Sequence, residues 1–383
     1  MDATPRLSGT NQGRARSYNR TLVLSHVRVR GASGRAEIAR ASGLSTQAVS
    51  NIIADLQSDG LLAECGRRAG GRGLPAVQYA IEPDGGFALG VEVRPDALRA
   101  VLLDLAGGVR FSERVALARA EPSAVADAVS RLCDAARAHA GVPEDRLLGA
   151  GVVMPGPFGS TGLADSVTDL PGWHGIDPQP FLEQALGRPV RVENDANAAA
   201  IAERISGAAR GLRSYAFLYF GAGLGLGIVA DGRLVRGAYG NAGEIGHVPH
   251  GSGRLEDVAS RLALARRLAA EGLSGATVEE IDTLHDHPAL HRWLDDAASA
   301  LAATVLTLEN LLDPETVVLG GALPDRVIDA LVARVELSPL SVSHRPGRAV
   351  PRLLRGAGGR MTAALGAAAL VLDHAFTPRI AAA

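Results

Sequence analysis

Polar side chains that could bind a hydroxyl-rich ligand occur together near the middle of this chain. Asn194, Asp195 and Asn197 follow a short apolar strand that ends at Val192. Side chains in this position lie at the carboxyl end of a strand, where α/β sheets form their ligand crevices. Carboxylates and amides can accept hydrogen bonds from hydroxyl groups, and a carboxylate can also act as a general base. The pattern indicates a ligand site, although an Asn-Asp pair taken alone is also typical of a turn.

A second set of short polar residues occurs near the N-terminus. The segment from Thr46 to Ser58 places apolar residues at i, i+3, i+4 and i+7, which predicts a helix, and Ser45 before it is a good N-cap. The opposite face carries polar groups that can reach base edges in the major groove of DNA. With Ser45, the candidate DNA-binding residues of this segment are Thr46, Gln47, Ser50 and Asn51.

The residues around this helix predict a winged helix-turn-helix domain over residues 19–82, preceded by a flexible arm at 1–18. A shorter helix and a glycine-containing turn come before the helix, as in helix-turn-helix units, and two strands, at 60–64 and 76–81, follow it. The glycine-rich loop between the strands carries three arginines, which we expect to contact the DNA backbone or minor groove. They are Arg67, Arg68 and Arg72. The plainer alternative is a small helical bundle whose basic loop is only solvated.

The remaining residues, 86–383, alternate strands and helices, which predicts an α/β domain. A three-strand meander begins at Phe87. A second meander begins at Ser214 and includes an Asp231-Gly232 hairpin turn. The similar layout of the two halves indicates a weak internal duplication. We therefore expect two lobes with a cleft between them, which is a common place for a small-molecule site.

Composition and charge restrict the class of protein. The chain has 383 residues but only two cysteines, too few for a disulfide framework or a four-thiolate zinc site. It has no secretory signal and no run of about 18 apolar residues, so we expect a cytoplasmic protein without a membrane span. Residues 1–80 hold 11 arginines against 5 acidic residues, whereas residues 81–383 hold 28 against 36. A basic head on an acidic body indicates an anionic partner at the head only.

Three longer motifs resemble those of the ROK family (repressor, open reading frame, kinase), which contains sugar-responsive regulators and sugar kinases. The motifs are Val192–Ala199, Gly240–His247 and Val317–Gly321. The resemblance spans nearly the whole sequence. It implies an actin-like (ribonuclease H-like) two-lobe body of the sugar-kinase type at 86–383, which binds ligand and forms dimers. It also implies that the head is the winged domain of the regulator branch.

The resemblance also implies which residues hold a sugar. Asn194 and Asp195 would bind it, and Asp195 would be the general base in a kinase. Glu244 and His247 resemble the family's E-x-G-H motif, and Glu256 matches a further glutamate that contacts the sugar. Each residue alone has a purely structural interpretation, but their order along the chain favours one ligand site.

Three departures from the family pattern argue against phosphoryl transfer and against a bound metal. The D-x-G-x-T turn of the kinases is replaced by Glu92-Val93-Arg94-Pro95-Asp96, with a bulky arginine and a proline that lacks an amide donor. The G-T-G loop has become Gly221-Ala222-Gly223, without the hydroxyl. The segment after His247 lacks the cysteines of the family's zinc site, and two histidines are too few for zinc. We expect no cofactor, no metal and no kinase activity, because phosphoryl transfer depends on positioning and charge neutralisation.

These observations predict a sugar-responsive transcriptional regulator, a repressor of carbohydrate-metabolism genes. Its partners would be pseudo-palindromic operator DNA, a sugar or sugar derivative, and further copies of itself in a homodimer or a tetramer. Two alternatives stay open. One is an ATP-dependent sugar kinase with a DNA-binding head, supported by the intact Asp195. The other is a regulator whose sugar site is a relic.

Overall fold

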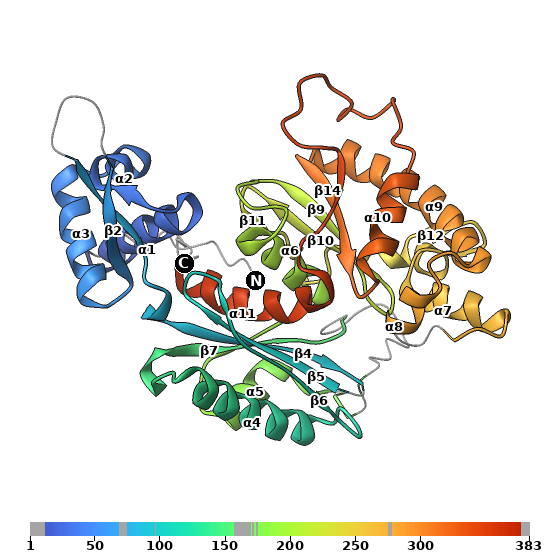
Figure 1. Ribbon diagram of the computed structural model, residues 1–383, viewed down its shortest axis with the longest axis horizontal. Coiled ribbons are helices and arrows are strands. Elements are labelled where there is room, and N and C mark those ends of the chain that lie inside the picture. The colour runs from blue at the N-terminus through green and yellow to red at the C-terminus, as the bar shows by residue number, and fades with distance from the viewer. Residues whose placement is uncertain are drawn as a thin grey trace, which may run out of the picture.

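The computed structural model describes residues 12–68, 75–95, 97–156, 170, 172, 173, 175–274 and 278–376. An N-terminal head, blue in Figure 1, lies beside a body of two lobes, and the C-terminal helix (red) lies between the lobes and next to the head. This arrangement confirms the expected two-lobe α/β body behind a helical head.

The head is a winged helix-turn-helix. It contains helices α1 (Gln12–Arg30), α2 (Arg35–Ser42) and α3 (Thr46–Ser58), and a sheet in the order β1 (Ser33–Gly34), β3 (Ala76–Ile81), β2 (Leu62–Arg68). The chain turns between α2 and α3 at Gly43, whose φ of 71° favours glycine. Helix α3 has the predicted bounds, and the Ser45 hydroxyl caps it by accepting a hydrogen bond from the amide of Ala48.

The first helix is longer than the sequence suggested. We expected a flexible arm over residues 1–18, but α1 begins at Gln12, so this expectation is wrong for residues 12–18. Arg16 in this extension, and Arg20 after it, form ion pairs with Asp55 and Asp59 near the end of α3. Each pair joins residues 39 positions apart, which a local sequence pattern does not reveal.

The first lobe is built on a five-stranded sheet in the order β6-β5-β4-β7-β8. Its strands are β4 (Phe87–Arg94), β5 (Ala97–Asp104), β6 (Val109–Ala116), β7 (Leu147–Val153) and β8 (Val190–Glu193). The first three form the predicted antiparallel meander, whereas β4, β7 and β8 run parallel. Helices α4 (Pro122–Ala140) and α5 (Pro178–Leu186) cover the outer face. Residues that follow the parallel strands therefore meet at one edge of the sheet.

The second lobe repeats this plan, with strand order β11-β10-β9-β14-β15. Its strands are β9 (Tyr215–Phe220), β10 (Leu224–Ala230), β11 (Arg233–Leu234), β14 (Thr316–Gly321) and β15 (Leu353–Arg355). Helices α7 (Arg261–Ala270), α8 (Val278–Thr283), α9 (Pro288–Leu312) and α10 (Asp325–Arg334) pack on it, and β12 (Pro249–His250) pairs with β13 (Gly253–Arg254). Asp231 and Gly232, both with positive φ, form the predicted hairpin turn. The matching strand orders confirm the internal duplication.

Helices α6 (Asp195–Ser206) and α11 (Thr362–Phe376) fill the space between the two sheets. Glycines let the backbones approach closely. A Cβ added to Gly151 of β7 would overlap the carbonyl oxygen of Ala367 in α11, and a Cβ added to Gly366 of α11 would overlap that of Ala198 in α6. Because α6 begins at Asp195, this packing fixes the helix that positions the candidate ligand site.

The head and the body share one hydrophobic core. Residues of α1 and α11 that are buried in it include Val23, Leu24, Val27, Val371, Leu372 and Phe376. Beyond the end of α3, Arg146 of the body donates hydrogen bonds to the carbonyl oxygens of Asp59 at 2.9 Å and Gly85 at 3.1 Å. The orientation of α3 relative to the body is therefore set by packing and hydrogen bonds.

Candidate functional site

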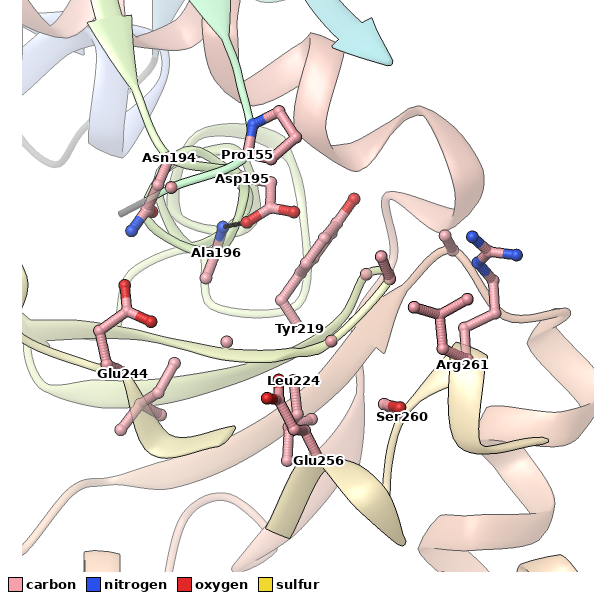
Figure 2. A pocket seen from close by; sticks show the side chains of 18 of the residues that line it. Pro155, Asn194, Asp195, Ala196, Tyr219, Leu224, Glu244, Glu256, Ser260 and Arg261 are labelled. Atoms are coloured by element: carbon pink, nitrogen blue, oxygen red, sulfur yellow. Dashed lines mark hydrogen bonds between the residues drawn. The ribbon is translucent and has the colours of Figure 1, made fainter. Parts of the chain in front are cut away.

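A cavity of about 850 Å³ opens between the two lobes. One wall is formed by residues at the carboxyl ends of β4, β7 and β8, and the other by residues of the second lobe. The cavity brings together all five residues predicted to hold a sugar, which are Asn194, Asp195, Glu244, His247 and Glu256. Figure 2 shows four of them, contributed by segments far apart in the chain. The cavity lies at the sheet edge where the sequence predicts a crevice.

Asn194 and Asp195 lie where β8 passes into α6. Asn194 is the N-cap of α6, and its side-chain oxygen accepts a hydrogen bond from the amide of Asn197 at 2.8 Å. Its side-chain nitrogen is therefore the group left for a ligand. Asp195 accepts from the amide of Ala196 through Oδ1 at 2.9 Å, the dashed line in Figure 2. Its Oδ2 lies beside Gly221, whose missing side chain leaves room for that oxygen.

Two neighbours of this pair hold its backbone in place and do not line the cavity. Asn197 is fully buried, and its Nδ2 donates to Oε1 of Glu193 at 3.0 Å. Glu193 also accepts from Nε of Arg236 at 2.8 Å, which ties β8 to the second lobe. The motif thus divides into two ligand-facing residues and two supporting ones, a distinction that the sequence does not make.

Burial changes the acid–base chemistry of the cavity. It raises the pKa of Asp195 from 3.8 to about 7, and the carboxylates of Glu92 and Glu244 add to the rise. Burial also raises the pKa of Glu244, with a contribution from Glu256 and an opposing one from His247. A carboxylate that is largely removed from water stays ionised more easily when hydrogen-bond donors bind to it. A ligand with several hydroxyl groups supplies such donors.

Glu244 and His247 reach the cavity from the turn that follows β11. Gly243 permits the approach, because its φ is 99° and an added Cβ would overlap the carbonyl oxygen of Leu226. Nε2 of His247 lies 3.8 Å from Oε2 of Glu244. Nδ1 of His247 is buried without a hydrogen-bond partner among the described residues, so it is a further group that a ligand or water can satisfy.

The turn after β4 contains an internal ion pair. Nε and Nη2 of Arg94 lie 2.8 and 2.7 Å from Oε1 of Glu92. Both residues line the cavity together with Pro95, whereas Asp96 lies outside the described residues. Ala222 also lines the cavity. A guanidinium thus compensates the charge of Glu92 at Oε1.

Several cavity residues were not anticipated from the sequence, among them Tyr219, Arg254, Ser260 and Arg261. All six residues of β9 are buried, so no alternating pattern marks Tyr219. The pKa of its hydroxyl is well above the ordinary value because of burial and the nearby carboxylates of Glu92 and Asp195. Ser260 caps α7, and nothing in the local sequence distinguishes the two arginines.

Within the part of the chain that the structure describes, no three His, Cys, Asp or Glu side chains are grouped so as to hold a metal ion. His250 lines a separate, smaller cavity. The absence of zinc stays a prediction. Among the same residues, no helix combines the length and apolarity needed to cross a membrane.

The predicted DNA-reading residues lie on the outer face of α3 and at its N-cap. Ser45, Thr46, Gln47 and Asn51 are exposed, and Ser50 is half-buried. Nε2 of Gln47 donates to Oδ1 of Asn51 at 3.1 Å, and the Ser50 hydroxyl donates to the carbonyl oxygen of Thr46 at 2.9 Å. Gln47 and Asn51 therefore form an exposed polar pair that can reach a groove.

Two of the three arginines predicted to contact DNA from the wing lie within the described residues. Arg67 and Arg68 are exposed at the end of β2, which runs to Arg68 and so is longer than the predicted strand at 60–64. They pair in register with Val77 and Ala76 of β3. Arg72 lies outside the described residues.

The chain is similar in sequence to a known protein family and to known repressors. The ROK family model matches residues 88–374. A xylose repressor from Bacillus spizizenii is 25% identical over 379 residues, which cover 94% of this chain and 96% of the repressor. The repressor is thus similar over both the head and the body.

Two solved structures share the fold. A ROK family transcriptional regulator, a homologue of the E. coli MLC protein, matches with a TM-score of 0.74 and 22% identity, covering 95% of this chain and 97% of its own. A ROK hexokinase from Thermus thermophilus matches with a TM-score of 0.57 and 30% identity, covering 74% of this chain and 97% of its own. Since the family model spans most of its length, the chain belongs to the ROK family.

Proposed function

We propose that this protein is a transcriptional repressor of carbohydrate-metabolism genes that binds operator DNA through its head, binds a sugar or sugar derivative between its lobes, and has no kinase activity. The observation that carries the proposal is the direct packing of a winged helix-turn-helix head on a body that holds a polar cavity. The xylose repressors of two Bacillus species, similar over nearly the whole chain, support the regulatory role.

The ligand would act through the helices that join the two sites. Helix α6 begins at Asp195 and packs on α11, which packs in turn on α1 of the head. A ligand changes the affinity for DNA only through its different affinity for two conformations, and such coupling is typically about 1–3 kcal/mol. In a two-fold dimer, or a tetramer built from such dimers, two heads would read a pseudo-palindrome with half-sites about one helical turn, or a multiple, apart.

Fluorescence anisotropy with duplexes from the promoter region of the protein's own gene tests the DNA-binding role. We expect tight binding that weakens steeply as salt rises, because phosphate contacts release counterions. A sugar that binds the cavity should change the affinity, and Asp195→Ala should remove this response. Failure to bind any such duplex, or affinity that does not depend on salt, contradicts the proposal.

A sugar kinase with a DNA-binding head is the second candidate. One observation favours it: Asp195 is intact and buried, and its pKa of about 7 suits a general base. The Glu92–Arg94 ion pair and Ala222 oppose it. We expect no ATP turnover with a panel of hexoses above that of an Asp195→Asn variant. Turnover of about 1–100 per second, the range of ordinary kinases, would establish the kinase instead.

Calorimetry distinguishes our proposal from a regulator that does not bind sugars. Under our proposal at least one sugar releases or absorbs heat on binding, and Asp195→Ala abolishes that heat. If the DNA is bound but no sugar is, the cavity is a relic.

A further inference from the structure

Glu92 is a buried carboxylate in the wall of the interlobe cavity, with a relative exposure of 5%. Its two oxygens are in different situations. Oε1 receives both Nε and Nη2 of Arg94, at 2.8 and 2.7 Å. Oε2 has no hydrogen-bond partner among the described residues. A buried acceptor of this kind costs free energy unless a group in the cavity donates to it.

The other ionisable groups at this end of the cavity are mainly acidic. Asp195 and Glu244 line the same space as Glu92, whereas the guanidinium of Arg94 is already bound to Oε1 of Glu92. Figure 2 shows Arg261 on the opposite side of the cavity from Asp195 and Glu244. This end of the cavity therefore offers several carboxylate oxygens that can accept hydrogen bonds. The charge of Arg94 is already paired with Glu92.

Two further arginines line the cavity, and each lies near a carboxylate. Arg254 lies 3.7 Å from Glu256, and Arg266 lies 3.4 Å from Asp257. A dianionic group that entered near Glu92 would thus face like charges, which repel strongly where water is scarce.

We propose that the Glu92–Arg94 pair selects the ligand: Oε2 of Glu92 accepts a hydrogen bond from a hydroxyl of an unphosphorylated sugar, and the pair rejects the phosphate ester of the same sugar. A hydroxyl can donate to the unpaired oxygen, whereas a phosphate dianion brings only acceptors and negative charge. This inference rests on the proposed function, because it names the ligand class of that site. Glu92 is thereby the residue that determines specificity, and Arg94 orients it by binding Oε1.

Isothermal titration calorimetry on the full chain with matched pairs of compounds tests the proposal. The probes are glucose, mannose and N-acetylglucosamine, each with its 6-phosphate, and xylose with its 5-phosphate. For the sugar that binds best, we expect the wild type to prefer the free form by at least about tenfold, the worth of a hydrogen bond to a charged group.

Three variants separate the roles of the pair. Glu92→Gln keeps the shape but removes the negative charge, so it should reduce the preference for the free sugar by about tenfold. Arg94→Ala should leave the preference unchanged or increase it, because it removes the cation that binds Oε1 of Glu92. Glu144→Gln is the matched control: this carboxylate lies outside the cavity, 2.9 Å from Arg188, and its replacement should leave the preference unchanged. The preference is a ratio for two ligands on one variant, so partial unfolding cancels.

The outcomes distinguish this inference from the proposed function. A phosphate ester that binds the wild type as tightly as its parent sugar overturns the inference. Loss of binding of the phosphate ester in Arg94→Ala also overturns it. Both results leave the proposed sugar-binding regulator in place. An unchanged preference in Glu92→Gln overturns it too. If none of the compounds binds, the sugar-binding part of the proposed function fails and the inference fails with it.

Discussion

The charge of the Asp195 side chain depends on the residues that surround it. Burial, with help from Glu92 and Glu244, raises its pKa from 3.8 to about 7. A carboxyl with a raised pKa binds its proton more tightly in the folded chain than in the unfolded one. It therefore contributes stability below pH 3.8, and this contribution is lost as the pH rises through about 7.

We expect the stability of Asp195→Asn relative to the wild type to increase between pH 4 and pH 8, because asparagine has no charge to bury. The interval between the two pKa values sets an upper limit of about 4 kcal/mol on the gain. Urea unfolding of both proteins at several pH values measures it. A difference between the two proteins that stays constant with pH would contradict the account of Asp195.

Residues on the head should separate into two classes when their DNA binding is measured. Asn51→Ala should cost about 1–3 kcal/mol on the operator and little on unrelated DNA, because it removes a base contact. Arg67→Ala should weaken binding to all sequences and reduce the salt slope by about one, because it removes a phosphate contact. Anisotropy titrations over a range of salt concentrations distinguish the two. If Asn51→Ala weakened operator and unrelated DNA equally, Asn51 would not read a base.

The sequence predicted the cavity at the level of residue types but not of contacts. Asn194 and Asp195 were predicted from their place after a strand and from a family pattern, and Glu244 from the family pattern alone. The bond between Arg94 and Glu92, and the support that Glu193 gives to Asn197, depend on side-chain directions at the ends of strands. Such directions do not follow from residue spacing.

At the scale of elements, the contact of α11 with the first sheet depends on glycine. We expect Gly151→Ala to destabilise the protein by about 3 kcal/mol or more, because the new Cβ would overlap the backbone of Ala367, which cannot move without shifting α11. Urea unfolding gives the loss. Gly86→Ala is the control, since its Cβ would meet only the flexible end of Leu148, 3.2 Å away, and it should cost much less. Equal losses would show that the close approach is unimportant.

Elements were predicted well where the signals are local. The bounds of α3 follow from its N-cap at Ser45 and its apolar spacing, both within a few residues. The start of α1 was missed because Arg16 and Arg20 are held by Asp55 and Asp59, which are distant in sequence. The pairing of the strands into two sheets of the same order likewise depends on contacts between distant segments.

At the scale of the whole molecule, partly buried charges join the head to the body. Burial of Arg28 in α1 lowers the pKa of its guanidinium to about 10, while Asp373 of α11 favours the charge and Arg204 of α6 opposes it. Arg204 also forms an ion pair with Asp373. Asp373 therefore compensates guanidinium groups that come from the head and from the helix of the ligand site.

We expect Asp373→Asn to destabilise the protein by about 1–3 kcal/mol, because it leaves partly buried guanidinium groups without this carboxylate. Adding Arg28→Met should recover much of the loss, since it removes one of the uncompensated charges. A double-mutant cycle by urea unfolding measures the coupling. If the two effects simply add, the head and the body are not coupled through these charges.

The common interior of α1 and α11 limits how this protein can be recombined with its relatives. A chimera joined at residue 82 would place foreign side chains against Val371, Leu372 and Phe376, which in this chain are buried together with residues of α1. Redirecting the protein to a new operator therefore requires keeping the inward side of α1 and altering only the outward residues of α3 and the wing. Transplanting a complete head would succeed only together with matching changes in the last helix.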